Sequence, residues 1–236
     1  LFQIGVVNVP DSLIAREVDC GCYLNAGREV GVASTKSFTS QVIILSMISI
    51  WFSQLKNINN QLRKEYINCL RSLSQDVKFT IDKTHNSIKN VVKLFMDKPS
   101  TFVLGKGKSE AIAKEAALKI KEISYIHAEG YSSGSLKHGP FALLEKGFPV
   151  ILIGINNEFY RKIENAYEEI KSRHAEIIFI TDKKTEKKNS IVVPYNKVYS
   201  DLLCIIPLQL LAYEISIGKG INPDMPKNLA KVVTVE

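Results

Sequence analysis

The stretch TFVLGKGKSEAIAKEAALKIKEISYIHAE, residues 101–129, predicts a buried strand followed directly by a helix. Residues 101–107 form an apolar, β-rich run that ends in glycines. Residues 109–129 place apolar side chains at helical spacing, which indicates one long helix. The turn between them, GKGKSEA (105–111), is suited to anion binding because the first N–H groups of a helix are free to donate. It is neither a Walker motif nor a complete G-x-G-x-x-G, so the turn alone identifies no ligand.

The same alternation continues toward the C-terminus. Apolar runs at 148–156, 176–182 and 190–196 predict three more strands, an amphipathic helix is expected over 157–175, and an apolar helix over 199–220. Strands that are apolar on both faces and alternate with helices are typical of a parallel sheet covered by helices on each side. The sequence therefore predicts an α/β fold.

The N-terminal residues repeat the second half of this unit. A strand and turn, FQIGVVNVPDS, a short strand, DCGCYLNAG, and an apolar helix, STKSFTSQVIILSMISIWFSQL, follow one another in the same order. The chain opens in a strand-like run with Leu1 in first place, so we expect a fragment of a longer polypeptide. The predicted division is the back half of one subdomain (1–55), linker helices (56–99), a complete subdomain (100–220) and a C-terminal tail (221–236).

Composition and charge narrow the class of protein. The chain has 236 residues, of which 45% are hydrophobic and 23% charged, as in soluble globular proteins. Serines interrupt the apolar run at 42–52, which is too short to span a bilayer, so we expect a buried helix and neither a membrane segment nor a signal peptide. The net charge is +7, but the densest lysine run, DKKTEKKN (182–189), contains acidic residues and predicts a solvated loop. A generally positive field would still favour a small anionic ligand such as a sugar phosphate.

The four cysteines show no paired C-x-x-C spacing, and two lie in apolar helical stretches. They are expected to be free, buried thiols in a reducing cytosol. Cys20 and Cys22 have no nearby His or further Cys, so we expect no metal site, and no cofactor is predicted.

Three positions stand out as candidates for chemistry. Lys119 and Glu122 share helical stripes with apolar neighbours; they are either a routine surface ion pair or, if water-poor, a proton-transfer site. His138 precedes Gly139-Pro140 at a predicted helix start and is either a base or an exposed loop residue. His127 is placed on the predicted helix and interpreted as structural. The hydroxyl-rich stretch VASTKSFTSQ (32–41) is expected to cap a helix through Ser34 or Thr35.

Taken together, several motifs resemble one enzyme family. GVASTKSFTSQ, ALKIKEISYIHAEG, LKHGPFALL, CIIPLQLLAYEI and the terminal NLAKVVTVE resemble the isomerase region of the glutamine:fructose-6-phosphate aminotransferases, over the whole chain. The resemblance implies sugar isomerase (SIS) subdomains of the flavodoxin-like α/β type, each a parallel sheet sandwiched by helices. It also implies a cytoplasmic homodimer that binds fructose 6-phosphate and glucosamine 6-phosphate, with a glutaminase domain upstream.

The resemblance carries roles onto four residues. It implies that Lys231 forms a Schiff base with the open-chain ketose and that Glu122 moves a proton between C1 and C2. His138 would open the sugar ring, reaching the site from the neighbouring subunit. Lys119 would support the ring oxygen and the C2 centre.

Val32 and Ser34 correspond to sugar contacts of the family. The family's phosphate-binding Ser/Thr loop belongs to the front half of the first subdomain, which these 236 residues do not contain. Ser135 stands where the family usually has Glu, and Lys227 and Val232 where it usually has Arg and Ser.

Two functions follow as expectations. The first is the isomerase region of the enzyme that converts fructose 6-phosphate and glutamine to glucosamine 6-phosphate and glutamate. The alternative is a naturally truncated, non-catalytic module for sugar-phosphate binding or dimerisation. A nucleic-acid-binding function lacks any motif that joins aromatic and basic residues.

Overall fold

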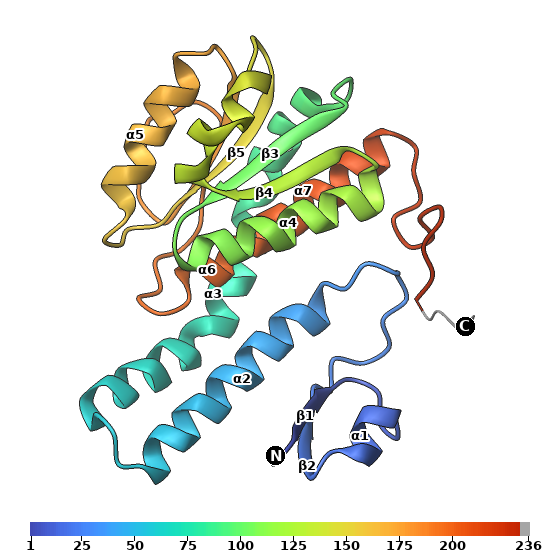
Figure 1. The fold of residues 1–236 in the computed structure, drawn as a ribbon, viewed down its shortest axis with the longest axis vertical. Coiled ribbons are helices and arrows are strands. Elements are labelled where there is room, and N and C mark those ends of the chain that lie inside the picture. Colours follow the sequence, from blue (N-terminus) through green and yellow to red (C-terminus); the bar gives the residue numbers. More distant parts are fainter. Residues whose placement is uncertain (232–236) are drawn as a thin grey trace.

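The computed structural model describes residues 1–231, and its centre is a five-stranded parallel sheet (Figure 1). The strand order is β4-β3-β5-β6-β7 and every neighbouring pair is parallel. Numbered within the unit, this order is 2-1-3-4-5, as in flavodoxin-like folds. The α/β prediction is confirmed. The strands are β3 (Ser100–Gly105), β4 (His127–Ser132), β5 (Pro149–Gly154), β6 (Glu176–Thr181) and β7 (Ser190–Val192).

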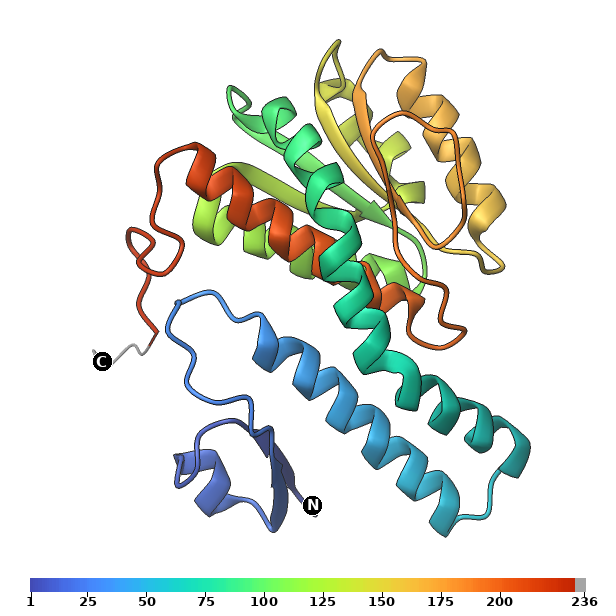
Figure 2. The ribbon, with the colours of Figure 1, turned by 180° about the vertical axis from the view of Figure 1, so that it is seen from behind.

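Helices cover both faces of this sheet, as Figures 1 and 2 show. On one face the core joins α3 (Asn60–Val92), α4 (Lys108–Ser124), α6 (Ser200–Leu203) and α7 (Ile205–Gly218). On the other it joins α5 (Tyr160–Lys171) and the 3₁₀ segments η2 (Ser133–His138) and η3 (Pro140–Leu143). Successive strand residues enter opposite cores, as Val103 and Leu104 do, because side chains alternate along a strand. A third 3₁₀ segment, η1 (Lys93–Phe95), leads from α3 into β3.

Helix α4 lies close to strand β4 where three alanines form part of its buried face. Ala113, Ala116 and Ala117 are buried with almost no exposed surface. Opposite them, a Cβ atom on Gly130 of β4 would lie 2.5 Å from the Lys114 Cα. Small residues on both surfaces therefore allow the backbone contact that fixes α4, the helix that carries Lys119 and Glu122.

The N-terminal part is a second, smaller parallel pair. β1 (Ile4–Val7) pairs in parallel with β2 (Cys20–Tyr23). The short helix α1 (Leu13–Glu17) connects the two strands, and α2 (Lys36–Leu55) follows them. The strand, strand and helix order matches the predicted repeat. Helix α3, with 33 residues, connects this part to the larger body in Figure 1.

Two predicted element boundaries are wrong. The predicted helix over 109–129 ends at Ser124, because Tyr125 adopts a left-handed conformation (φ 59°) and the chain then pairs with β3 as strand β4. His127 is consequently an exposed strand residue 3.3 Å from the Glu129 carboxylate, not a helical one. The predicted helix over 199–220 is divided at Cys204 into α6 and α7.

Helix α2 is not the buried helix that its composition predicts. Ser37 is its one buried residue, while Leu45, Trp51 and Leu55 are each more than half exposed. Within residues 1–231, the two-stranded sheet is too small to cover an apolar helix of this length. By length and hydropathy alone, Lys36–Leu55 and Ser200–Gly218 could each cross a membrane, a test that core helices also pass; the second is mostly buried here.

The cysteines are free, as predicted, but only in part buried. Cys204 is fully buried in the core beside α7. Cys20 and Cys22 are exposed on β2, so the expectation of burial is wrong for them.

Candidate functional site

The Lys119 ammonium group is enclosed by two carboxylates of its own helix. Its Nζ lies 2.7 Å from Glu122 Oε2 and 3.5 Å from Glu115 Oε1. The Lys119 side chain is only 5% exposed, compared with 61% for Lys114, which pairs with Glu110 on the same helix. The lysine is therefore buried and its two carboxylate partners are half-buried, so the interpretation as a routine surface ion pair does not hold. The spacing of Glu115 to Lys119 is i,i+4, so the sequence itself contained the signal for this second partner of the lysine.

The C-terminal tail brings Lys231 to the loop between β2 and α2. Lys231 Nζ donates to Glu29 Oε2 at 2.8 Å and to the carbonyl oxygens of Gly31 at 3.2 Å and Val32 at 3.3 Å. Ser34 Oγ donates to the same Glu29 oxygen at 3.3 Å. Three predicted residues, Val32, Ser34 and Lys231, thus meet in one place. Glu29 was not predicted, because nothing in the sequence links it to a lysine about 200 residues away.

Further contacts tie the tail to the end of α4. The Lys227 backbone N–H donates to the Tyr125 hydroxyl at 2.7 Å, and the Lys227 ammonium lies 4.5 Å from the centre of that ring. Asp224 lies against Gly31. Figures 1 and 2 both show the tail beside the loop that precedes α2. The tail therefore connects the loop to the helix end just beyond Glu122.

Electrostatics favour the charged form of Glu29. Burial acts to raise the pKa of this carboxyl, but the hydrogen bond and the positive charge of Lys231, together with the nearby Ser37, outweigh it. The net pKa lies below its ordinary value. The site thus holds a carboxylate and an ammonium in direct contact.

The hydroxyl groups before α2 do not cap that helix as predicted. Thr35 occupies the N-cap position without a side-chain capping bond, and the Ser34 hydroxyl is engaged by Glu29 instead. Capping would require a hydroxyl oxygen to accept from a backbone N–H of the first turn, and the Thr35 side chain accepts no such bond. The Ser34 hydroxyl shares the Glu29 oxygen to which Lys231 donates.

His138 lies elsewhere. It is the exposed last residue of η2, beyond the carboxyl end of β4, and Pro140 begins η3 as the sequence predicted. Glu122, in contrast, lies in the last turn of α4, which leads into the amino end of β4. The six residues of β4 separate these two ends by roughly 20 Å. Within one chain the structure does not bring His138 to Glu122.

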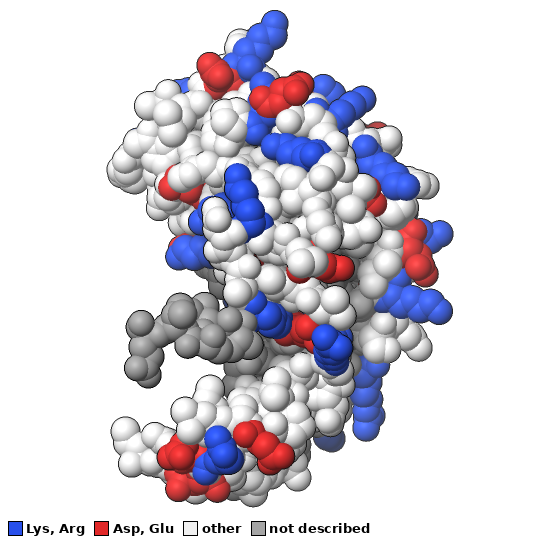
Figure 3. Space-filling view, turned by 90° about the vertical axis from the view of Figure 1, so that its right-hand side faces the viewer, with Lys and Arg blue, Asp and Glu red and all other residues white. Residues whose placement is uncertain are grey.

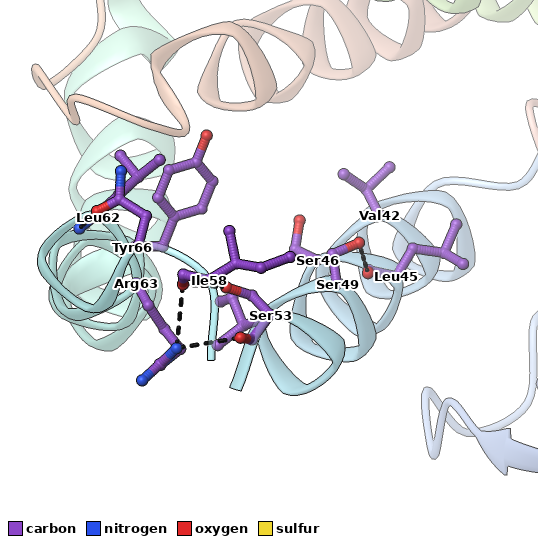
Figure 4. Close-up of a pocket in the computed structure, with 11 residues that line it drawn as sticks. Val42, Leu45, Ser46, Ser49, Ser53, Ile58, Leu62, Arg63 and Tyr66 are labelled. Carbon is purple, nitrogen blue, oxygen red and sulfur yellow. Dashed lines mark hydrogen bonds between the residues drawn. The ribbon is translucent and has the colours of Figure 1, made fainter. Parts of the chain in front are cut away.

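An apolar groove lies away from all of these residues. It has a volume of about 460 Å³ and runs between α2 and the start of α3 (Figure 4). Val42, Leu45 and Leu62 line it, and at its floor Arg63 donates to the Ser53 and Ile58 carbonyls. It contains none of the predicted site residues and no carboxylate, so it lacks the groups for proton transfer.

The predicted anion-binding turn lies at the start of α4 beside carboxylates. The Ser109 hydroxyl donates to Asp201. Asp201 and Asp182 both line a small cavity of about 150 Å³. Burial raises the pKa of Asp201, although the Ser109 hydrogen bond and Lys108 oppose it. The two carboxylates at this turn would repel a bound anion, and the structure therefore does not favour the predicted anion site. Within residues 1–231, no cluster of three His, Cys, Asp or Glu residues is placed to hold a metal ion.

The fold and these residues define a protein with a SIS domain: residues 94–195 match the family described as SIS domain. Over its whole length the chain is 50% identical to a probable glutamine–fructose-6-phosphate aminotransferase (isomerizing) of Acanthamoeba polyphaga mimivirus. It is 38% identical to the corresponding enzyme of Escherichia coli K12. The chain spans 39% and 40% of the length of these two relatives.

Solved structures agree with these relatives. The C-terminal domain of glucosamine-fructose-6-phosphate aminotransferase from Francisella tularensis has a TM-score of 0.88 at 37% identity, covering 94% of this chain and 64% of that one. A glucosamine-6-phosphate deaminase from Thermotoga maritima, at 24% identity and TM-score 0.78, shares the fold. This chain is thus a homologue of the C-terminal isomerase region of glutamine–fructose-6-phosphate aminotransferases, and the resemblance seen in the sequence motifs is confirmed.

Proposed function

We propose that this chain is the isomerase region of an enzyme that converts fructose 6-phosphate and glutamine to glucosamine 6-phosphate and glutamate. The relatives bear this name, and a glutaminase domain upstream would account for the rest of their length. The observation that carries the proposal is the contact of Lys231 with the loop of Val32 and Ser34. A lysine amine can condense with the carbonyl group of a ketose, and the neighbouring hydroxyl and carbonyl groups can form hydrogen bonds with the sugar.

The chemistry divides among the predicted residues. Lys231 condenses with the C2 carbonyl of the open-chain ketose, and the resulting imine makes the C1 proton acidic. Glu122 moves that proton between C1 and C2. Lys119 holds the Glu122 carboxylate at 2.7 Å and supports the ring oxygen and C2. Val32 and Ser34 contact the sugar beside Lys231.

A dimer completes the site. Because His138 and Glu122 lie at opposite ends of β4, the ring-opening histidine comes from the neighbouring subunit. Mixing Glu122→Gln with His138→Ala protein tests this, since a mixed dimer holds one site with both residues intact. Partial recovery of isomerase activity is expected; no recovery would overturn the exchange between subunits.

The proposal also covers the location, partners and domain division of the protein. We also propose a cytoplasmic enzyme without cofactor, metal, membrane or nucleic-acid partner. Pairing of lysines in the 182–189 loop with carboxylates supports only the last of these, because paired lysines are less free to bind phosphates. Lys187 pairs with Glu164 and Lys188 with Glu176. Figure 3 shows both signs of charge interspersed over one face. The division into a partial first subdomain (1–55), linker (56–99), second subdomain (100–220) and tail (221–236) is also proposed.

The test is isomerisation by the complete protein expressed from its full gene. Glu122→Gln should abolish conversion of fructose 6-phosphate while leaving fold and dimer intact. Glu110→Gln, on the same helix but on its exposed side, is the matched control and should retain activity. Retained activity in Glu122→Gln would remove Glu122 from the mechanism. Thermal stabilisation by the sugar phosphate without turnover in the wild type would favour the non-catalytic module instead.

A further inference from the structure

Glu29 is a half-buried carboxylate whose contacts point to a chemical task. Its side chain is 14% exposed, and its Oε2 atom receives hydrogen bonds from Lys231 Nζ at 2.8 Å and Ser34 Oγ at 3.3 Å. The remaining bonds of the Lys231 ammonium go to the backbone carbonyls of Gly31 and Val32. A carbonyl oxygen does not take up a proton at neutral pH. Among these acceptors, Glu29 is therefore the one able to remove a proton from Lys231.

We infer that Glu29 is the proton-transfer partner of Lys231 during imine formation. The inference rests on the proposed function, in which Lys231 attacks the ketose carbonyl. An ammonium has no lone pair, so Lys231 must lose a proton before it can act as a nucleophile.

The proton balance closes with Glu29 alone. The Lys231 ammonium gives one proton to the Glu29 carboxylate, and the neutral nitrogen bonds to the carbonyl carbon. A proton moves from that nitrogen to the former carbonyl oxygen, which gives a neutral carbinolamine. The Glu29 carboxylic acid then protonates the hydroxyl, the C–O bond breaks, and water leaves. The products are the protonated imine, one water molecule and the Glu29 carboxylate, ready for the reverse steps.

The other carboxylate of the site, Glu122, already has a lysine partner of its own. Glu122 contacts the buried Lys119 ammonium, which stays within α4. The loop, the start of α2 and the described part of the tail also carry the charged side chains of Arg28, Lys36, Asp224 and Lys227, and the Lys227 ammonium lies against the Tyr125 ring. Lys36 donates to the Arg28 carbonyl, and Asp224 lies against Gly31. Two separate carboxylates thus serve two separate protons, one on nitrogen and one on carbon.

The test measures imine formation directly in the complete protein. Fructose 6-phosphate is added with cyanoborohydride, which reduces an imine to a stable amine, and the adduct on Lys231 is followed by peptide mass spectrometry. Glu29→Gln keeps an amide oxygen that can accept the Lys231 hydrogen bond but cannot take its proton. The labelling rate should fall about 10²-fold, the low end of general acid–base catalysis. Glu29→Asp should recover part of the rate, and the Glu110→Gln control should label normally.

The outcomes separate the two proposals. Labelling of Lys231 in Glu29→Gln at the wild-type rate would overturn the role of Glu29 while leaving the Schiff base in place. Absence of a Lys231 adduct in the wild type, or an adduct that persists in Lys231→Arg, would overturn the proposed function itself. The pH profile adds a second measure. Since the pKa of Glu29 lies below its ordinary value, wild-type labelling should fall only in acid, and Glu29→Gln should lack that acid limb.

Discussion

Replacing Lys119 by Met tests whether the ion pair on α4 is as buried as its geometry indicates. The substitution keeps the apolar stem and removes an ammonium that is 5% exposed. It leaves Glu115 and Glu122, 15% and 21% exposed, without their shared cation. Breaking a buried ion pair from one side costs about 3–5 kcal/mol. Because both carboxylates retain some contact with water, we expect the lower end, about 3 kcal/mol.

Urea unfolding followed by circular dichroism measures this free energy, and the same helix provides the control. Lys114→Met removes an ion pair of nearly equal length, 2.8 Å, whose lysine is 61% exposed. Exposed pairs of this spacing contribute about 0.3–0.5 kcal/mol. A loss for Lys119→Met no larger than that for Lys114→Met would refute the reasoning. Neutralising both carboxylates together with Lys119→Met should restore most of the stability, since no unpaired charge then remains buried.

Two further predictions concern packing and pH. Gly130→Ala places a Cβ 2.5 Å from the Lys114 Cα, so strand and helix backbones must separate, at a cost of about 2–3 kcal/mol in urea unfolding. Gly134→Ala meets only the end of a lysine side chain at 3.6 Å and should cost little; equal losses would contradict the steric argument. Asp201→Asn should stabilise the protein at pH 7 but not near pH 3. The raised pKa of Asp201 means that burial penalises its ionised form, and this penalty appears as pH rises through the folded-state pKa. The amide oxygen can still accept from Ser109, and a gain independent of pH would show that charge is not the cause.

The sheet was predictable where strands are apolar on both faces. Strands β3, β5 and β6 fall within two residues of the predicted runs, because each is buried between two layers of helices. Strand β4, with the sequence HAEGYS, was missed. It lies at the edge of the sheet and carries polar residues, so its sequence has no apolar run to separate it from the preceding helix. The left-handed Tyr125 that ends α4 is also a residue type seldom found in that conformation.

The candidate site was predictable only where its residues lie close together in the sequence. Spacing along one helix identified Lys119 and Glu122, but their burial depends on how α4 packs against α7 and the sheet. The positions of Val32, Ser34 and Lys231 came from the resemblance of motifs, and their contact in the structure could not be read from periodicity. Glu29 escaped both approaches, since a carboxylate in a loop has no pattern and its partner lies about 200 residues away.

The loop of Glu29 and the tail of Lys231 are far apart in the sequence, and the long helix α3 lies between them in the chain. Helix α3 has 33 residues and is therefore about 50 Å long, and as one continuous helix it spans the distance between the two parts of the chain. Its first turns pack beside α2, while Ile88 and Val91 near its end are buried in the core of the larger body. The loop of Glu29 precedes α2, and the tail of Lys231 follows α7, so α3 sets the distance across which the tail must reach. The hydrogen bond from the Lys227 backbone N–H to the Tyr125 hydroxyl holds the tail against the end of α4. Packing at both ends of α3 therefore places the Glu29 loop within reach of the tail, where Lys231 Nζ donates to Glu29 Oε2 at 2.8 Å.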